Sequence, residues 1–403
     1  MFSSIDTLEK RKHQTCKVYT CKVDYSHLSK TQLNHLNRLF LEAKWLCNAQ
    51  LASSDIFHFD YKVKEVLILN KDKQTELREI KFLSSQMRQS IVDRNKQNII
   101  NLSKSKKKGN TVGRLKFRSR INSIPLKQFD ITYKILNSKY IHIQNLKSDI
   151  KVQGLNQIPD DADFANATLT KHNKDFFIKI TCFLQNVDKV KTGKVIGLDF
   201  GIETTVSTSN HEKYYFEFPE TKGIKKASKH LNRCDKGSKN RYKAKLKLQK
   251  QYDKLTNQKN DARHKFIHEI TTENDEVHIQ NDSIHSWHAS KLKGFGRRIQ
   301  HGIIGGIKSD LKSKSTTSIK PQNFPSTKLC PVCGTLNDKM SLLENRIYKC
   351  DCGYIEDRDI HSAINMLPTE HRNKMLSERK PLIYICIFPN RSSFLVEEGS
   401  LCL

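Results

Sequence analysis

Two close pairs of cysteines near the C-terminus constrain this chain more than any other feature. Cys330-Pro-Val-Cys333 and Cys350-Asp-Cys352 are separated by sixteen residues. Four thiolates at such spacing are typical of a closed tetrahedral zinc site, although the same cysteines would also suit four reduced thiols without a metal. We predict one structural Zn²⁺ held by all four, with Gly353 easing the sharp bend at the tighter second pair.

Two aspartates lie where regular elements are expected to begin or end. Asp199 closes the apolar segment Val195-Ile-Gly-Leu-Asp-Phe-Gly201, and Asp359 opens an apolar run directly after the cysteines. Hard divalent cations such as Mg²⁺ take oxygen ligands, and a pair of them can stabilise both the attacking and the leaving oxygen of a phosphodiester. Asp199 and Asp359 are therefore candidate magnesium ligands. The alternative is that Asp199 caps a turn and Asp359 caps a helix.

The charge balance indicates a polyanionic partner. The chain carries 71 Lys and Arg against 42 Asp and Glu, a net charge of +29 over 403 residues. Clustered cations bind phosphates through counterion release, so nucleic acid is the expected partner, and a basic ribosomal or membrane-surface protein is the alternative. A chain of this length can bury two or three cores.

The sequence indicates a cytoplasmic protein that does not act at a membrane. No stretch approaches the roughly 18 apolar residues of a membrane helix, and residues 1–6 lack a basic-then-apolar signal. If the source is prokaryotic, we expect association with the nucleoid. Seven further cysteines are scattered, and the odd total of 11 favours free thiols that pack in the interior. A monomer is the favoured oligomeric state.

The first half of the chain predicts a small barrel divided by helices. Residues 16–24 alternate like a half-buried strand, and apolar residues then recur at helical spacing from 30 to about 104. Short alternating segments follow at 115–118, 141–144, 150–152 and 176–181, which favours an antiparallel barrel completed by the first strand. The expected domains are the first barrel strand (1–29), a helical recognition insertion (30–108) and the β-barrel, or wedge, domain (109–190).

The second half predicts an α/β domain interrupted by the cysteine module. The strand at 195–201 precedes β-like segments at 204–208 and 214–218, a very basic helical stretch at 222–270, a strand at 276–280 and a helix near 297–312. The expected boundaries are 191–315 for the first part, 316–354 for the zinc ribbon and 355–370 for the final helix. Residues 371–403 are expected to form a poorly ordered tail.

Basic residues in this half are candidate phosphate contacts, with a solvated helix face as the alternative. The candidates are Lys239, Arg241, Lys243, Lys247, Arg297 and Arg298.

The order of these motifs resembles the TnpB family, transposon-encoded RNA-guided nucleases related to type V CRISPR effectors. The resemblance covers about residues 16–370. It rests on the segments Phe40–Ala49, Gly113–Arg118, Val195–Ile202, Gly237–Arg241, Asn257–Lys265, Thr327–Gly334 and Asp357–Asn365. It implies an α/β multidomain protein: an RNase H-like (RuvC) domain with an inserted zinc ribbon, preceded by a split β-barrel with a helical insertion. It also implies a guide RNA encoded at the transposon end, and double-stranded target DNA that is paired with the guide and cut with Mg²⁺.

The chain departs from the family at the middle catalytic carboxylate. Most members have a glutamate at the end of the strand where this chain has Gln280, and an amide supplies no negative charge to a divalent cation. Asp282 lies two residues on, on the same side of an extended strand, and one TnpB branch has an acid at a similar position. We therefore expect Asp199, Asp282 and Asp359 to form the catalytic site. The alternative is a nuclease-deficient RNA-guided DNA-binding protein, a repressor or a decayed transposon copy, and a DDE-type transposase is a weaker third.

Overall fold

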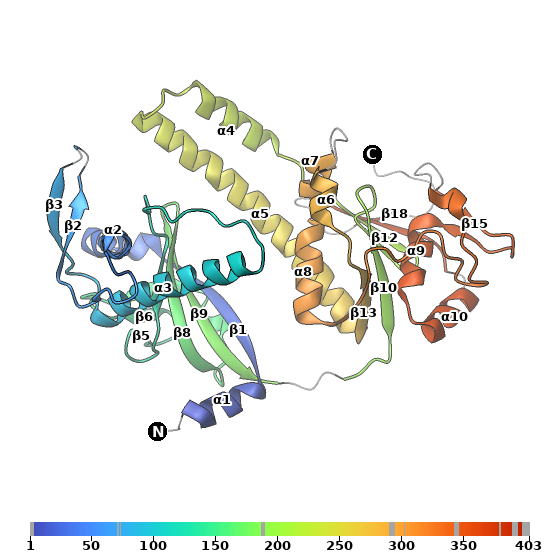
Figure 1. Cartoon of the computed structure of the whole chain (residues 1–403), viewed down its shortest axis with the longest axis horizontal. Helices are drawn as coiled ribbons and strands as arrows, with labels where there is room; N and C mark the ends of the chain where they lie inside the picture. Colours follow the sequence, from blue (N-terminus) through green and yellow to red (C-terminus); the bar gives the residue numbers. More distant parts are fainter. Residues whose placement is uncertain are drawn as a thin grey trace. The chain divides into compact units, whose positions relative to one another are not determined.

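The chain forms two compact units, Met1–Asp188 and Lys189–Leu403, in a computed structural model (Figure 1). The structure describes residues 4–70, 72, 74–186, 190–289, 295–301, 303–341, 346–378, 380–388 and 394–396. Each unit is considered by itself.

The first unit is built on a seven-stranded antiparallel sheet with the order β4-β8-β9-β1-β7-β6-β5. The strands are β1 (Gln14–Val23), β4 (Ser123–Leu126), β5 (Tyr133–Ile135), β6 (Tyr140–Ile143), β7 (Ile150–Gln153), β8 (Asp163–His172) and β9 (Asp175–Gln185). The sheet is barrel-like, and β1 joins β9 to β7 as the sequence predicted. The prediction of a strand at 115–118 is wrong. This segment is irregular, and its alternating Leu115 and Phe117 are exposed rather than packed on a sheet.

Helices and a hairpin fill residues 30–108 of this unit. The helices in this range are α2 (Lys30–Ala52) and α3 (Ser85–Lys107). Outside it lie α1 (Ser4–Lys12) and the short turns η1 (Tyr25–His27) and η2 (Leu155–Gln157). Ser29 and Ser84 accept backbone hydrogen bonds and so begin α2 and α3. Apolar residues of both helices share one core with the sheet. The hairpin of β2 (Glu65–Leu69) and β3 (Thr75–Glu79) between the helices was not predicted.

The second unit contains a mixed seven-stranded sheet with the order β14-β13-β10-β11-β12-β17-β18. The strands are β10 (Val195–Phe200), β11 (Val206–Thr208), β12 (Glu212–Phe216), β13 (Glu276–Gln280), β14 (Thr316–Lys320), β17 (Ile383–Ile387) and β18 (Phe394–Val396). The antiparallel meander β10-β11-β12 confirms the sequence prediction. Strands β13 and β14 run parallel to β10, so their carboxyl ends meet at one edge of the sheet.

Helices cover both faces of this sheet (Figure 1). The helices of the second unit are α4 (Lys222–Arg233), α5 (Lys239–Glu273), α6 (Ile284–Ala289), α7 (Phe295–His301), α8 (Ile304–Lys314), α9 (Arg358–Met366) and α10 (Thr369–Ser377), with the turn η3 (Asp338–Ser341). Helices α5 and α8 share a core with β10 and β13. Helix α9 lies on the opposite face, beside the cysteine module with its two strands β15 (Ile347–Lys349) and β16 (Ile355–Asp357). The predicted basic stretch at 222–270 is two helices joined by a turn.

Several predicted boundaries change. Residues 316–320 were assigned to the zinc ribbon, but they form β14 at the edge of the sheet. The tail was expected to be poorly ordered, yet the apolar segment Ile383–Ile387 is β17 and pairs along the whole of β12. Cys386 in this strand is disulfide-bonded rather than a free thiol. Among the described residues, no helix combines the length and apolarity that a membrane crossing needs.

Candidate functional site

The three predicted acidic residues come from neighbouring elements of the second unit. Asp199 lies in β10, Asp282 follows β13 by two residues, and Asp359 lies in the first turn of α9. Strands β10 and β13 are adjacent and parallel, with Leu198 opposite Ile279, so Asp199 and the residues after β13 reach the same sheet edge.

Helix α9 crosses β10 at very close range, and Gly197 permits the contact. A Cβ atom at Gly197 would lie 2.1 Å from the carbonyl oxygen of Ala363, a separation that no side chain tolerates. The absence of a side chain at Gly197 therefore lets α9 settle on the strand that carries Asp199.

Asp357, rather than Asp359, caps α9. The Asp357 carboxylate accepts hydrogen bonds from the backbone N–H groups of Asp359 (2.9 Å) and Ile360 (3.2 Å). The carboxylate of Asp359 is instead held by the Thr204 hydroxyl at 3.1 Å and by the Lys213 ammonium at 3.2 Å. The helix-cap alternative for Asp359 is therefore wrong, and its carboxylate projects from the helix.

Asp199 shows most clearly that the three carboxylates share one site. Its pKa is raised well above the ordinary value, first because burial disfavours the charge, and then because the negative charges of Asp359 and Asp282 oppose its ionisation. Lys308 acts in the opposite direction. A site in which carboxylates repel one another is favourable for a divalent cation, which would relieve the repulsion.

Asp282 is fixed by a buried lysine that was not predicted. The Lys308 ammonium donates to the Asp282 carboxylate at 2.9 Å and to the Gln280 carbonyl oxygen at 2.8 Å. It also lies 5.1 Å from the ring centroid of Phe200. Lys308 is only 5% exposed, so its charge is compensated almost entirely by these groups.

Gln280 is part of the structural frame at the end of β13. Its Nε2 donates to the carbonyl oxygens of Gln322 (2.9 Å) and Phe324 (2.8 Å), and its Oε1 accepts from the Ser326 hydroxyl at 2.9 Å. A glutamate could not donate to the two carbonyl groups. The amide at position 280 therefore matches its surroundings chemically, which the sequence alone did not reveal.

Lys213 is the second buried lysine of the site. Its ammonium lies 2.7 Å from the Asp357 carboxylate and 3.2 Å from that of Asp359. Burial lowers the pKa of Lys213, but Asp359 and Asp357 outweigh that effect and the net pKa shift is upward. Four carboxylates, those of Asp199, Asp282, Asp357 and Asp359, thus share their surroundings with Lys213 and Lys308.

The carboxylate oxygens of the three aspartates are spaced too widely to surround a single ion without other ligands. Among the described residues, only the four cysteines form a group of three or more potential ligands whose atoms all lie within 4.8 Å of one another. The aspartate oxygens are more widely spaced. Oxygen donors at wider spacing fit hard cations such as Mg²⁺, which keep several waters, or a pair of cations about 3.5–4 Å apart.

The cysteines fit a tetrahedral zinc ion closely. Sγ–Sγ distances are 3.7 Å for Cys330 and Cys352 and 3.5 Å for Cys333 and Cys350. Zinc–sulfur bonds of 2.3 Å at the tetrahedral angle place sulfur atoms about 3.8 Å apart. A hydrogen bond to Thr335 is the main cause that lowers the pKa of Cys333 to about 6, whereas burial raises that of Cys330 to about 12. A bound cation would favour the thiolate at both.

The cysteine module is attached to α9 by buried side chains. The His361 ring stacks on Tyr348 with centroids 3.8 Å apart, and burial lowers the pKa of His361 to about 3, so the ring is neutral. The Asn365 amide donates to the carbonyl oxygens of Ser326 (2.8 Å) and Leu329 (2.7 Å). A metal in the module would therefore also stabilise the helix that carries Asp359.

The predicted basic residues have different surroundings. The Arg241 guanidinium donates to the carbonyl oxygens of Leu231 (2.9 Å) and Cys234 (2.8 Å), so one nitrogen is engaged in the α4–α5 turn. Lys239, Lys243 and Lys247 are exposed on α5. Arg298 is exposed on α7, 4.0 Å from Glu203, whereas the side chain of Arg297 lies outside the described residues.

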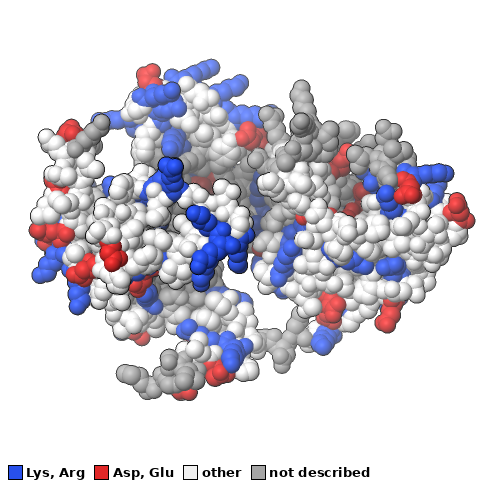
Figure 2. All heavy atoms as spheres, in the orientation of Figure 1, with Lys and Arg blue, Asp and Glu red and all other residues white. Residues whose placement is uncertain are grey.

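Sequence reasoning missed most of a basic surface over α4 and α5 (Figure 2). Only Lys247 of the predicted residues lines the groove between these helices, and the other basic groups come mainly from α4. The spacing of the α4 lysines by three and four residues was the available indication.

Comparisons with known proteins place parts of the chain in known families. The family OrfB_IS605, described as "Probable transposase", matches residues 175–282, and "Cas12f1-like, TNB domain" matches residues 307–366. A Streptomyces pristinaespiralis protein named "Putative RNA-guided DNA endonuclease" is 28% identical over 219 residues, 52% of this chain and 54% of that protein. The chain thus matches about half the length of this relative.

Two solved structures are similar at low identity. "Cryo-EM structure of the Cas12f1-sgRNA-target DNA complex" has a TM-score of 0.41 and 14% identity, covering 70% of each chain. "Structure of the mini-RNA-guided endonuclease CRISPR-Cas_phi3" has a TM-score of 0.34 and 12% identity, covering 68% of this chain and 65% of that chain. Together, the two family matches and the Streptomyces relative support a TnpB-like protein.

Proposed function

We propose that this TnpB-like protein is an RNA-guided DNA endonuclease with a RuvC-like, RNase H-type second unit. The observation that carries the proposal is the placement of Asp199, Asp282 and Asp359 at one edge of the sheet, and the raised pKa of Asp199 is consistent with it. Three acids from separate segments at one sheet edge support a site for hard divalent cations. The sheet, a meander extended by two parallel strands, is consistent with the fold that the TnpB resemblance implies.

Asp199, Asp282 and Asp359 would hold Mg²⁺, which when bound supplies activation of a water molecule and neutralisation of the leaving oxygen. The chain's own residues position these ligands. Thr204 and Lys213 orient the Asp359 carboxylate, and Lys308 orients that of Asp282. Attack of water on phosphorus breaks the bond to the 3′ oxygen and leaves a 3′-hydroxyl on the DNA. The guide RNA would supply sequence specificity through base pairing.

A nuclease-deficient RNA-guided DNA-binding protein is the second candidate. Two observations favour it: Gln280 is built into a network that a glutamate would disrupt, and Asp282 is ion-paired with Lys308 at 2.9 Å. A protein of this kind would bind target DNA beside its guide RNA and would act as a repressor or persist as a decayed transposon copy.

The test is cleavage of a plasmid library by protein purified with RNA expressed from its native locus, in Mg²⁺. We expect guide-dependent cutting that disappears in Asp199→Ala, Asp282→Ala and Asp359→Ala. The matched control is Asp261→Ala, an exposed aspartate of α5 outside the site. Guide-dependent DNA binding without cutting in the unsubstituted protein would establish the binding-only alternative. Cutting that survives Asp282→Ala would remove Asp282 from the catalytic set.

A further inference from the structure

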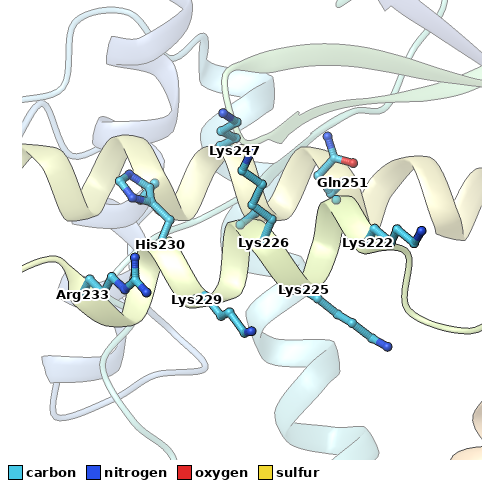
Figure 3. Close-up of a pocket in the computed structure, with 11 residues that line it drawn as sticks. Lys222, Lys225, Lys226, Lys229, His230, Arg233, Lys247 and Gln251 are labelled. Atoms are coloured by element: carbon cyan, nitrogen blue, oxygen red, sulfur yellow. The ribbon is translucent and has the colours of Figure 1, made fainter.

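The turn between α4 and α5 folds these two helices into a hairpin with a groove along it (Figure 3). The groove has a volume of about 690 Å³. Its walls include the buried methyl groups of Ala227 and Ala244, so the helices approach closely at its floor. The groove lies away from the carboxylate site and is not used by the proposed catalysis.

Cationic side chains line the groove in two rows on α4. Lys222, Lys226 and His230 form one row and Lys225, Lys229 and Arg233 the other, each with four-residue spacing. Residues four apart lie about 6 Å apart along a helix axis. Figure 3 shows Lys226 directed toward Lys247 of α5, while Lys225 and Lys229 point away from that helix. The rows thus present regularly spaced positive charges on both sides of α4.

Acidic side chains of the protein do not neutralise the positive charge of the groove. From Lys222 to Tyr252 the chain has twelve lysines or arginines and one acidic residue, Asp235. Within the part of the chain that the structure describes, none of the lining residues is acidic and no lining lysine or arginine forms an ion pair. Clustered like charges repel one another, so the surface favours a ligand with several regularly spaced negative charges.

The lining side chains indicate which polyanion fits. No Phe, Tyr or Trp lines the groove in the described residues, and five lysines there outnumber His230 and Arg233, the two lining groups that could stack on an unpaired base. Two lining residues other than the lysines and the arginine, His230 and Gln251, carry hydrogen-bonding side chains. The 2′-hydroxyl of RNA donates and accepts hydrogen bonds, and DNA has no such group.

We propose that the α4–α5 groove binds the sugar–phosphate backbone of a double-stranded segment of RNA. The lysines and arginine contact phosphates, and His230 and Gln251 contact 2′-hydroxyl groups. This inference rests on the proposed RNA-guided function and assigns a binding surface to its RNA partner.

The test compares two triple variants of the full chain with equal loss of charge. The groove variant is Lys222→Gln, Lys226→Gln and Lys247→Gln. The control is Lys245→Gln, Lys250→Gln and Lys254→Gln, three exposed lysines of α5 that do not line the groove. Binding of a short RNA hairpin and of a DNA hairpin with the same sequence is measured by fluorescence anisotropy across a salt series. Thermal melting verifies that both variants fold.

We expect the groove variant to bind the RNA hairpin at least ~10-fold more weakly, with a salt slope smaller by about 2–3, since each lost phosphate contact lowers the slope by about one. The control should change affinity much less. Gln251→Leu should weaken RNA binding and leave DNA binding unchanged. Equal losses in both triple variants, or equal effects on RNA and DNA, would overturn the inference.

The outcome is independent of catalysis. If the protein cleaves DNA in a guide-dependent manner and the groove variant binds RNA with unaltered affinity, the proposal that the groove binds RNA is refuted and the proposed function stands. If the groove variant selectively loses affinity for RNA but the unsubstituted protein cuts no DNA, the proposed nuclease activity is refuted and the proposed RNA-binding groove stands.

Discussion

Single residues set the charge balance of the candidate active site. Among the residues of this site, Asp199 lies in surroundings that disfavour its charged form, because burial and two neighbouring carboxylates raise its pKa. The folded protein therefore holds a proton on Asp199 more tightly than the unfolded chain does. The contribution of Asp199 to the free energy of unfolding is therefore most favourable at low pH, and it is lost as the pH rises toward the raised pKa.

Asp199→Asn should therefore stabilise the metal-free protein at neutral pH, because it removes the buried charge and keeps the shape. We expect a higher Tm than the unsubstituted protein at pH 7.5, by about 2–4 °C for each kcal/mol recovered, and a smaller difference at acidic pH. Thermal melts in EDTA-free, magnesium-free buffer measure this. Asp261→Asn, at an exposed position, should change Tm little. A lower Tm for Asp199→Asn at neutral pH would contradict the assigned charge environment.

Gln280 provides a second prediction at this scale. Gln280→Glu would place a carboxylate against the carbonyl oxygens of Gln322 and Phe324. We expect a loss of about 1–3 kcal/mol in the free energy of unfolding and no gain in cleavage rate. Gln153→Glu, at an exposed strand end, adds the same charge and should be nearly neutral. A faster nuclease from Gln280→Glu would mean that position 280 is a lost catalytic acid.

At the scale of elements, the contact between α9 and β10 positions Asp359. Gly197→Ala should destabilise the protein by at least about 1–3 kcal/mol, because the new Cβ would collide with the backbone of α9 at Ala363. The matched control is Gly305→Ala in α8, where a Cβ would meet only Ile284 at 3.8 Å. That change should be neutral or stabilising by about 0.4–1 kcal/mol. Chemical denaturation distinguishes the two, and equal effects would contradict the close approach.

The cysteine module forms a second connection to α9, through His361 and Asn365. Cys330→Ser should remove the single zinc ion measured by atomic emission, since three thiolates and a hydroxyl no longer suit the site. Hydrogen exchange should then increase in the module and spread into α9. Cys234→Ser, at a free thiol of the α4–α5 turn, should retain zinc. Unchanged exchange in α9 after zinc loss would show that the module does not support that helix.

At the scale of the whole molecule, regular elements were predictable where local pattern and tertiary environment agree. The apolar runs of β10 and β13 are visible in the sequence because these strands are buried in the core of the sheet. In β1 the alternation indicates a strand, but only Cys21 and Val23 are buried, while Cys16 and Val18 are exposed. Strand β17 was missed although Ile383–Ile387 is β-like, since its partner β12 is about 170 residues earlier in the chain.

The charged frame of the site could not be predicted in the same way. Lys213 and Lys308 resemble surface lysines in sequence, and only the fold places them 6% and 5% exposed beside carboxylates. The amide of Gln280 is explained by a loop some 40 residues further on, which no local pattern connects to it. The net charge of +29 predicted a polyanion partner, but the groove that concentrates this charge depends on how α4 folds back on α5.

The most direct test of the account is titration of the zinc-loaded protein with Mn²⁺, a spectroscopically visible substitute for Mg²⁺, followed by electron paramagnetic resonance. If the three aspartates form one cation site, Asp199→Ala, Asp282→Ala and Asp359→Ala should each abolish or severely weaken Mn²⁺ binding, while Asp261→Ala binds normally. Normal Mn²⁺ binding by Asp282→Ala would contradict the claim that Asp282 completes the site.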